Sequence, residues 1–358
     1  MNSSRRTPKD ETPAPLLAWA CGFVSMLALG GAVLWTATAR SGEGEADPVT
    51  ATLDEVKAKV YASLDPLDVE GFEKLGPPKP GEWLSIYPEP VQPLETYKLQ
   101  KPTRATPQRR TIVLKPLGTF SAERRPVLEA MRAYAEAFFQ LPARIDPEVA
   151  LTAPEGKPDL FRIVPMGNRH GSYDKQYDGE RILTEVLKPR LPADAAVCLG
   201  ITMEDLWADD LTYVFGLGSF KHRVGVYSLA RYYPEFWGRR PLPGDDVKGL
   251  LRSCKVLNHE TGHMFGLTHC VFYRCSMNGS NSLPETDAAP IHFCPVCHRK
   301  LAWNLRFDPL KRYGDLEAFY AKQGLSTEAE WIGQRRTRWK TLAAREARTA
   351  DPEVEPGE

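Results

Sequence analysis

A short stretch, residues 259–269, carries the residue types of a metal-dependent hydrolytic site. It has the form H-E-x-x-H-x-x-G-x-x-H, with its histidines at His259, His263 and His269. On a helix, residues four apart share one face, so the first two imidazoles can bind one metal ion. Gly266 permits a positive φ, which lets the chain leave the helix and turn the third imidazole toward the same ion. Three neutral imidazoles and one open position describe a catalytic zinc site.

A carboxylate stands beside the first of these histidines. Glu260 directly follows His259, where it can take a proton from zinc-activated water. Zinc lowers the pKa of such water to about 7 and polarises a substrate carbonyl. The pattern therefore predicts that Glu260 is the general base. For the remaining histidines we expect only surface or packing roles: His170, His222, His292 and His298.

A second cluster consists of cysteines. Cys270 and Cys275 form one short-range pair, and Cys294 and Cys297 form a C-x-x-C pair. This spacing predicts a closed, tetrahedral zinc site whose metal stabilises the fold. Two disulfides are the alternative, which an oxidising compartment would favour.

The two clusters and their surroundings resemble the archaemetzincins, a metzincin family of zinc metallopeptidases. The histidine motif, the Cys275-Ser276-Met277 triplet and the C-x-x-C pair follow the family's order. The resemblance extends upstream through 199–206 and 213–217 and covers roughly residues 75–310. It implies a catalytic zinc, a general base, a structural zinc and a methionine turn. Their residues would be His259, His263 and His269; Glu260; Cys270, Cys275, Cys294 and Cys297; and Met277.

The fold and activity implied by this resemblance are specific. The fold class is α/β (α+β), with a mixed twisted sheet, a zinc-binding active-site helix, a methionine turn and a zinc subdomain built on the four cysteines. The activity is peptide-bond hydrolysis with two zinc ions per chain, acting on a peptide or protein substrate. That substrate would add to an edge strand before the zinc helix, within Leu211–Leu217 or Arg223–Leu229. The alternative is a catalytically weak or latent two-zinc module that binds peptides or proteins at a membrane.

Composition limits the classes of partner. The chain has 358 residues, 42% of them hydrophobic, enough for one large domain or two lobes. Its formal net charge is zero, so no electrostatic argument favours nucleic acid, and none is predicted as a partner.

The N-terminal part contains an uncharged, mostly apolar run at residues 12–39. Its core is long enough to span a bilayer as a helix. Basic residues precede it and acidic residues follow it, which predicts an anchor with the catalytic domain on the non-cytoplasmic side. The alternative is an exported protein, released by signal cleavage near Ala39.

The chain thus divides into five predicted segments. They are a cytoplasmic N-terminus (1–11), a membrane anchor or signal sequence (12–39), a spacer and Pro-rich strap (40–107), a metzincin-type catalytic domain with the structural zinc (108–312), and a C-terminal basic helix and tail (313–358). In the strap, eight prolines within 76–107 predict an extended segment without regular helix.

Several elements of the catalytic domain are predicted from apolar patterns. Apolar runs predict buried strands at Thr111–Leu117 and Ala195–Thr202, and helical periodicity predicts a helix capped by Ser121. A further helix is predicted at Ile182–Leu187, and the zinc helix is expected to begin near Asp245.

The C-terminal segment is basic and helical. Its arginines suggest a nucleic-acid or lipid surface, but we expect a solvated helix that packs Trp331 and Trp339 on the body.

Overall fold

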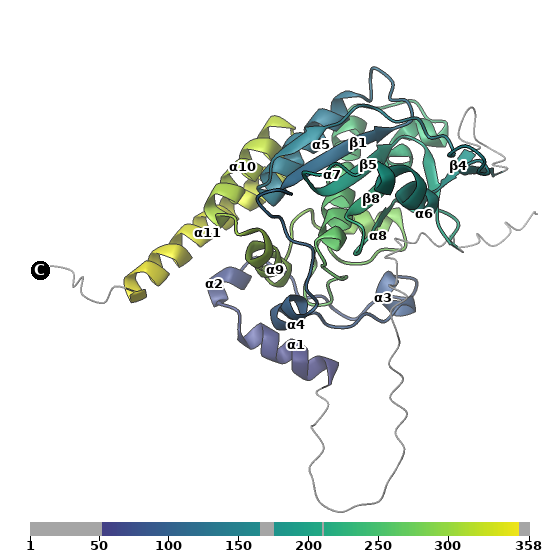
Figure 1. Cartoon of the computed structure of the whole chain (residues 1–358). Helices are drawn as coiled ribbons and strands as arrows, with labels where there is room; N and C mark the ends of the chain where they lie inside the picture. The colour runs from purple at the N-terminus through teal and green to yellow at the C-terminus, as the bar shows by residue number, and fades with distance from the viewer. Residues whose placement is uncertain (1–51, 165–174, 210, 351–358) are drawn as a thin grey trace, which may run out of the picture.

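The computed structural model describes residues 52–164, 175–209 and 211–350 (Figure 1). A five-stranded sheet forms the centre, in the order β2-β1-β5-β8-β7. Its strands run parallel except β7, which lies at one edge and is antiparallel to β8. A three-stranded sheet has the order β3-β4-β6. The strands are β1 (Thr111–Leu117), β2 (Ala143–Ile145), β3 (Phe161–Ile163), β4 (Lys175–Asp178), β5 (Ala195–Thr202), β6 (Asp205–Trp207), β7 (Gly216–Gly218) and β8 (Val224–Ser228).

Helices cover both faces of the large sheet, so its central strands are buried on both sides. All of β5 and nearly all of β1 are inaccessible, which explains their mostly apolar sequences. The exception in β1 is Lys115, whose ammonium group donates to Asp146 at 3.1 Å. Helices α5 (Pro126–Phe139) and α7 (Asp245–Met264) pack on one face in the larger core. A π-helix at Ile182–Leu187 packs on the other, after the short α6 (Gly179–Arg181). The mixed α/β fold is therefore confirmed.

The helix that carries the histidine motif begins as predicted. Gly244, with φ of 91°, precedes α7, and Asp245 and Asp246 lie in its first turn. Acidic side chains there interact favourably with the exposed N–H groups of the helix start. The helix then crosses the sheet and delivers His259 and His263 in its last two turns.

Two local predictions in this domain are wrong. Ser121 does not cap α5; its carbonyl accepts hydrogen bonds in a turn, and the helix begins later, at Pro126. Proline suits the first helical position because its φ is already helical and its missing N–H has no helical partner. The strand expected over Leu211–Leu217 is reduced to β7, with Val214 forming only an isolated bridge to Leu206.

The segment before the catalytic domain is not a free spacer. Helices α1 (Leu53–Ala62) and α2 (Pro66–Val69) pack on the body, and the Tyr61 hydroxyl donates to the Phe272 carbonyl at 2.6 Å. The Pro-rich strap contains short helices α3 (Trp83–Ile86) and α4 (Leu94–Leu99), contrary to the prediction. Prolines flank these helices without interrupting them, so short helical turns fit between prolines.

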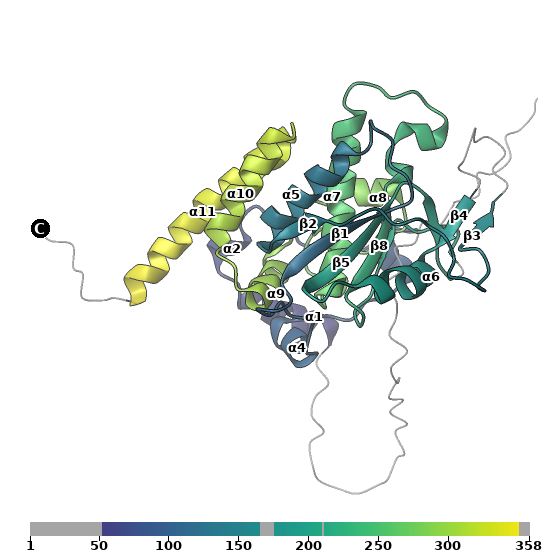
Figure 2. The same cartoon turned by 45° about the horizontal axis from the view of Figure 1, so that its top comes forward.

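The C-terminal segment forms a helical hairpin of α10 (Pro309–Lys322) and α11 (Ser326–Ala350), seen at one side of the body in Figures 1 and 2. The predicted domain boundary at residue 312 falls inside α10. Trp331 stacks on His292 with ring centroids 3.5 Å apart, and Trp339 packs edge-on against His298. The expectation of tryptophans packed on the body is confirmed. Helices α8 (Leu283–Ala288) and α9 (Pro295–Leu305) complete the fold.

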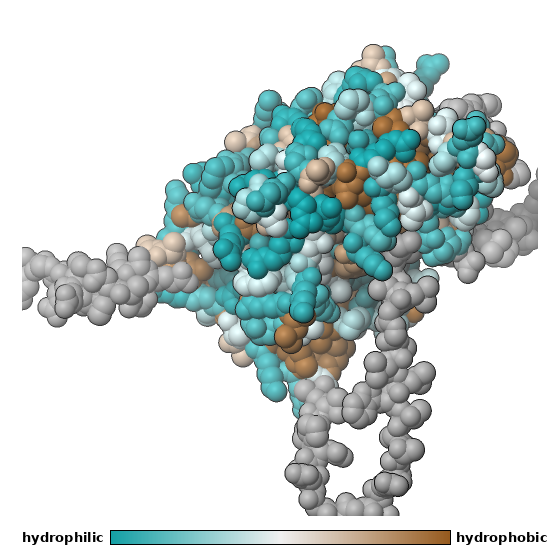
Figure 3. Space-filling model, viewed as in Figure 1, coloured by the Kyte–Doolittle hydropathy of each residue, from teal (hydrophilic) through white to brown (hydrophobic). Residues whose placement is uncertain are grey.

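The predicted membrane segment, residues 12–39, lies outside the described residues. Within the part that the structure describes, no helix combines the length and apolar character needed to cross a bilayer. The face in Figure 3 is mostly hydrophilic, with scattered apolar patches.

Candidate functional site

The end of α7 brings the three histidines of the motif together. The helix ends at Met264, and Gly266 follows with φ of 87°, the conformation predicted for it. The Gly266 amide donates to the His263 carbonyl at 2.8 Å, which closes the last turn. The chain then reverses and places His269 opposite the two helical imidazoles.

The three imidazoles converge through their Nε2 atoms. Nε2 of His259 lies 3.0 Å from that of His263 and 3.3 Å from that of His269. A tetrahedral zinc with bonds of about 2.0–2.1 Å holds its ligand nitrogens roughly 3.3 Å apart. The spacing therefore fits one ion bound by all three rings. Each ring is at most 4% exposed.

Each ring is oriented by a hydrogen bond from its other nitrogen. Nδ1–H of His259 donates to the Ser276 carbonyl at 2.9 Å, and that of His263 to the Leu267 carbonyl at 2.7 Å. Burial lowers the pKa of His259 to about 3 and that of His263 well below its usual value. Both rings are therefore neutral at physiological pH, as metal ligands must be.

The third ring has a carboxylate partner. Nδ1 of His269 lies 2.6 Å from Oε1 of Glu89, and the Trp83 indole N–H donates to the same oxygen at 2.9 Å. Burial by itself raises the pKa of Glu89, but these hydrogen bonds outweigh it and hold the pKa below its ordinary value. Glu89 is therefore ionised at neutral pH.

Glu260 lies between α7 and the edge strand β7. A Cβ at Gly216 would lie 2.9 Å from Cγ of Glu260, so only glycine leaves space there for this side chain. The carboxyl group is 1% exposed, and its Oε2 has no hydrogen-bond partner among the described atoms. Burial raises the pKa of Glu260 well above its usual value. A buried carboxyl group with an unsatisfied oxygen fits a site that awaits a proton-bearing ligand.

Met277 lies against the zinc helix. A Cβ at Gly262 would lie 2.4 Å from Sδ of Met277, so the glycine permits this close packing. The Met277 carbonyl accepts the Cys270 amide at 2.7 Å, which ties the turn to the residue after His269. Met277 therefore packs on the turn of α7 that carries His259 and His263.

The four cysteines of the second cluster also converge. Their sulfur atoms all lie within 4.8 Å of one another, and every side chain is buried. Sγ of Cys270 and Cys294 are 3.6 Å apart, close to the roughly 3.8 Å separation expected for a tetrahedral zinc with bonds of about 2.3 Å. Amide N–H groups of Met277 and Cys294 point at Sγ of Cys275. The cysteines are unbridged, so the two-disulfide alternative is not the arrangement in this structure.

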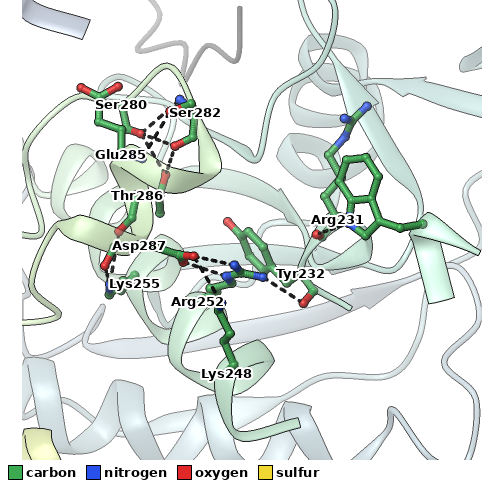
Figure 4. A network of polar contacts seen from close by, with 11 residues as sticks. Arg231, Tyr232, Lys248, Arg252, Lys255, Ser280, Ser282, Glu285, Thr286 and Asp287 are labelled. Atoms are coloured by element: carbon green, nitrogen blue, oxygen red, sulfur yellow. Dashed lines mark hydrogen bonds and ion pairs between the residues drawn. The ribbon is translucent and has the colours of Figure 1, made fainter. Parts of the chain in front are cut away.

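A polar network holds the chain beyond the methionine turn against α7 (Figure 4). Arg252 lies about two helical turns before His259 and forms a bidentate ion pair with Asp287, with N···O distances of 2.5 and 2.7 Å. Lys255 donates to the carbonyls of Thr286 and Asp287. Arg252 and Lys255 thereby hold α8 to α7, and α8 holds the loop after Met277 through Glu285 and Thr286, which bind Asn281 and Ser280.

The structure brings the seven predicted metal ligands together in two groups, three histidines and four cysteines, but the sequence predictions missed the supporting residues from the strap. Glu89 and Trp83 precede the histidine motif by more than 160 positions and belong to no motif. In the local sequence, Glu89 is an acidic residue and Trp83 a tryptophan among prolines. Such a pattern does not indicate that either side chain contacts a histidine far along the chain.

Comparisons with known proteins give a consistent set of relatives. A family model described as peptidase family M54 matches residues 170–303. Archaemetzincin-2 of Rattus norvegicus is 32% identical over 271 residues, which cover 68% of this chain and 73% of the relative. Archaemetzincin-2 of Homo sapiens is 31% identical over 263 residues, covering 65% and 70%. The archaemetzincin of Thermococcus kodakarensis is 40% identical over 133 residues, covering 37% and 70%.

Two solved structures are also similar. The archaemetzincin of Archaeoglobus fulgidus, in complex with malonate, is 24% identical with a TM-score of 0.39, covering 53% of this chain and 99% of that one. The archaemetzincin of Methanopyrus kandleri is 25% identical with a TM-score of 0.42, covering 56% and 98%.

Proposed function

We propose, from the premise that the chain belongs to the archaemetzincin family of zinc metallopeptidases, that it hydrolyses peptide bonds at the three-histidine centre with Glu260 as general base. The observation that carries the proposal is the convergence of three Nε2 atoms next to a buried carboxyl group with an unsatisfied oxygen. A structural zinc site has no use for such a group, because all its coordination positions belong to the protein.

In this reaction Glu260 moves protons. His259, His263 and His269 would hold a zinc ion, which would supply Lewis acidity toward water and the scissile carbonyl. Glu260 accepts the proton of the attacking water at its carboxylate and returns it to the leaving amine. Burial favours the neutral form of Glu260, and once ionised its poorly solvated carboxylate is a stronger base than an exposed one.

The peptide is proposed to bind along β7. This strand pairs with β8 on one side and ends the described sheet on the other. An added peptide strand would satisfy the remaining backbone groups without reading side chains. Because Gly216 and Gly218 of β7 contact Glu260, a peptide on this edge would lie next to the proposed base.

The second zinc is proposed at Cys270, Cys275, Cys294 and Cys297. Burial opposes ionisation of Cys270, but hydrogen bonds from the other three thiols lower its pKa well below the usual value. Burial raises the pKa of Cys275 and Cys294 well above the usual value, so a bound cation such as zinc would be what makes all four sulfurs thiolates together. Its metal would hold the start of α9 to the methionine turn.

Zinc content and peptidase activity test both assignments. We expect about two zinc ions per chain in the parent and in Glu260→Gln, with hydrolysis of a broad peptide pool only by the parent. Cys294→Ser is expected to lose one zinc and to melt at a lower temperature. Equal hydrolysis by the parent and Glu260→Gln would disprove the role of Glu260, and an unchanged zinc content in Cys294→Ser would disprove the structural site.

The closed state of the centre favours one further candidate function. Glu260 and the three histidines are each at most 4% exposed, so the centre offers little surface to a substrate. A latent two-zinc module that binds peptides or proteins would have this property. Two zinc ions without hydrolysis by the parent, across the whole peptide pool, would select this candidate.

We also propose that residues 12–39 place the catalytic domain at a membrane, on its non-cytoplasmic side. The support is the uncharged composition of this run and the basic residues before it. Extraction of membranes at alkaline pH and N-terminal sequencing test the proposal. An anchored chain stays in the membrane with its own N-terminus, a cleaved chain begins after Ala39, and a freely extractable, uncleaved chain would contradict both.

A further inference from the structure

The three proposed metal ligands differ in what holds their second ring nitrogen. His259 and His263 donate to backbone carbonyls of Ser276 and Leu267, which lie close by in the sequence. His269 instead faces the carboxylate of Glu89, 180 positions away. This carboxylate comes from the Pro-rich strap, outside the segment that matches the M54 family model.

We propose that Glu89 is a positioning residue for the catalytic metal, because its carboxylate fixes the orientation and tautomer of His269. The inference rests on the proposed function, in which His269 binds zinc. The strap would then be part of the metal site and would do more than cover the catalytic domain.

The physical effect of Glu89 follows from the two nitrogens of an imidazole. A carboxylate accepts a hydrogen bond but cannot donate one, so it keeps the ring proton on Nδ1 and leaves the lone pair on Nε2. Nε2 of His269 is the nitrogen that faces His259. The negative charge of Glu89 also strengthens His269 as a ligand for a cation, as carboxylate partners of metal-binding histidines do. A backbone carbonyl fixes the tautomer in the same way but carries no full charge.

Glu89 is itself held from both sides along the strap. On one side Trp83 donates its indole N–H to Glu89 and packs edge-on against His269, with ring centroids 5.0 Å apart. Trp83 lies so close to Gly279 that a Cβ there would be 2.4 Å from the indole. The strap therefore contacts both the third ligand and the chain just after the methionine turn.

On the other side, Gln92 fixes the strap to the turn between the zinc helix and His269. Its amide nitrogen donates to the Gly266 carbonyl at 2.9 Å, and its oxygen accepts the Thr268 amide at 3.2 Å. Buried Lys300 also donates to the side-chain oxygen of Gln92. These contacts determine the register of the strap, so Glu89 cannot slide away from His269 without breaking them.

The position of Glu89 distinguishes support from inhibition. An inhibitory strap would place its carboxylate at the centre formed by the Nε2 atoms, in competition with substrate. Glu89 contacts Nδ1, on the side of the ring that faces away from the other two histidines. The strap thus holds His269 from behind, and its carboxylate does not occupy the position between the Nε2 atoms.

The test is the zinc affinity of the full chain, measured by competition with a chromophoric chelator. We expect Glu89→Gln to bind the weaker of its two zinc ions about 10- to 100-fold less tightly than the parent, and Glu89→Ala at least as poorly. Glutamine keeps the shape and an acceptor oxygen, so folding is preserved while the charge is lost. Trp83→Phe, which removes the N–H donor to Glu89 and part of the ring that packs on His269, is expected to show a smaller loss because the carboxylate stays.

Glu95→Gln is the matched control. Glu95 lies in the same strap, its side chain is 77% exposed, and its ion pair with Lys98 stays within α4. Its replacement is expected to leave both zinc affinities unchanged. A second readout is the visible spectrum of the protein with cobalt at the catalytic site, which we expect to change in Glu89→Gln and not in Glu95→Gln.

The outcomes separate this inference from the proposed function. If His269→Ala loses one zinc but Glu89→Gln and Glu89→Ala bind as tightly as the parent, the role of Glu89 is wrong and the metal site stands. If His269→Ala retains two zinc ions, the metal site itself is wrong. Weak binding in Glu95→Gln as well would attribute the effect to the strap's general charge and overturn the specific role of Glu89.

Discussion

Glycine at two positions of β7 is what allows Glu260 to lie between the edge strand and the zinc helix. The contact at Gly218 is the tighter one, because a Cβ there would lie 2.7 Å from the backbone oxygen of Glu260. Backbone of a packed helix cannot yield as a flexible side chain does. Any side chain at residue 218 must therefore move the strand or the helix that carries the proposed base.

We predict that Gly218→Ala lowers the free energy of unfolding by roughly 1–3 kcal/mol, the usual cost of an overpacked core. The same displacement should reduce kcat/KM, because it shifts Glu260 relative to the histidines. Denaturant unfolding and peptidase assays measure the two effects. Gly76→Ala is the control, since a Cβ at Gly76 meets no atom within 4 Å. Parent-like stability and activity in Gly218→Ala would contradict this account.

The site residues that could be predicted from the sequence are those that lie close to one another along the chain. The motif histidines, Glu260 and the cysteine pairs lie a few positions apart, so helix geometry and ligand chemistry are enough to group them. Glu89 meets His269 across 180 positions, and Gly218 meets Glu260 through the packing of a strand on a helix. Such contacts depend on the tertiary fold and have no local pattern.

At the scale of elements, long apolar runs predicted the buried strands well, whereas prolines and short segments predicted the ends of helices and strands poorly. β1 and β5 are buried on both faces, so their sequences are mostly apolar, with Lys115 of β1 as a buried exception. The strap was misread because prolines mark helix ends as well as the absence of helix, and α4 begins directly after Pro93. The edge strand β7 is only three residues long, which is too short for alternation to appear.

The contact between α2 and α11 is a further element-level feature that the sequence did not predict. Asp68 and Arg335 form an ion pair in which each side chain is 1% exposed. Arg299, which follows the C-x-x-C pair closely, also lies 3.3 Å from Asp68. An N-terminal helix and the C-terminal helix are thus joined next to the cysteine cluster.

We predict that Arg335→Met lowers the free energy of unfolding by about 3–5 kcal/mol, because it leaves the buried carboxylate of Asp68 short of its main partner. Adding Asp68→Leu should restore part of the loss, since no buried charge then remains. Arg336→Met on the same helix is the control: its ion pair with Glu317 is about 40% exposed on both sides, so the change should stay below about 1 kcal/mol. A double variant that is less stable than Arg335→Met would contradict the desolvation argument.

At the scale of the whole molecule, segments from both ends of the described chain enclose the part that carries the two metal clusters. In the sequence, α1, α2 and the strap precede this part, and α10 and α11 come after it. In space, α1, α2 and α4 from the N-terminal side gather around α9 (Figures 1 and 2). Tyr97 of the strap is fully buried, and its hydroxyl donates to the Phe265 carbonyl at the end of the zinc helix at 2.7 Å. The stability of the proposed zinc centre therefore depends on residues outside the histidine and cysteine motifs.

This dependence predicts the behaviour of two fragments. Residues 52–358 retain the strap and the helices before it, whereas residues 108–358 retain every motif residue but lose Glu89, Gln92, Tyr97 and the partner of Arg335. Removing the strap also exposes apolar surface on the turn after α7. It leaves the Arg335 charge buried and unpaired, and the two effects together cost several kcal/mol.

We expect the longer fragment to bind two zinc ions and unfold in one cooperative transition. The shorter one should melt at a much lower temperature and hold its weaker zinc poorly, as measured by calorimetry and chelator competition. If residues 108–358 match the longer fragment in both measurements, the catalytic domain is independent of the strap, and the metal site is complete within its own motifs.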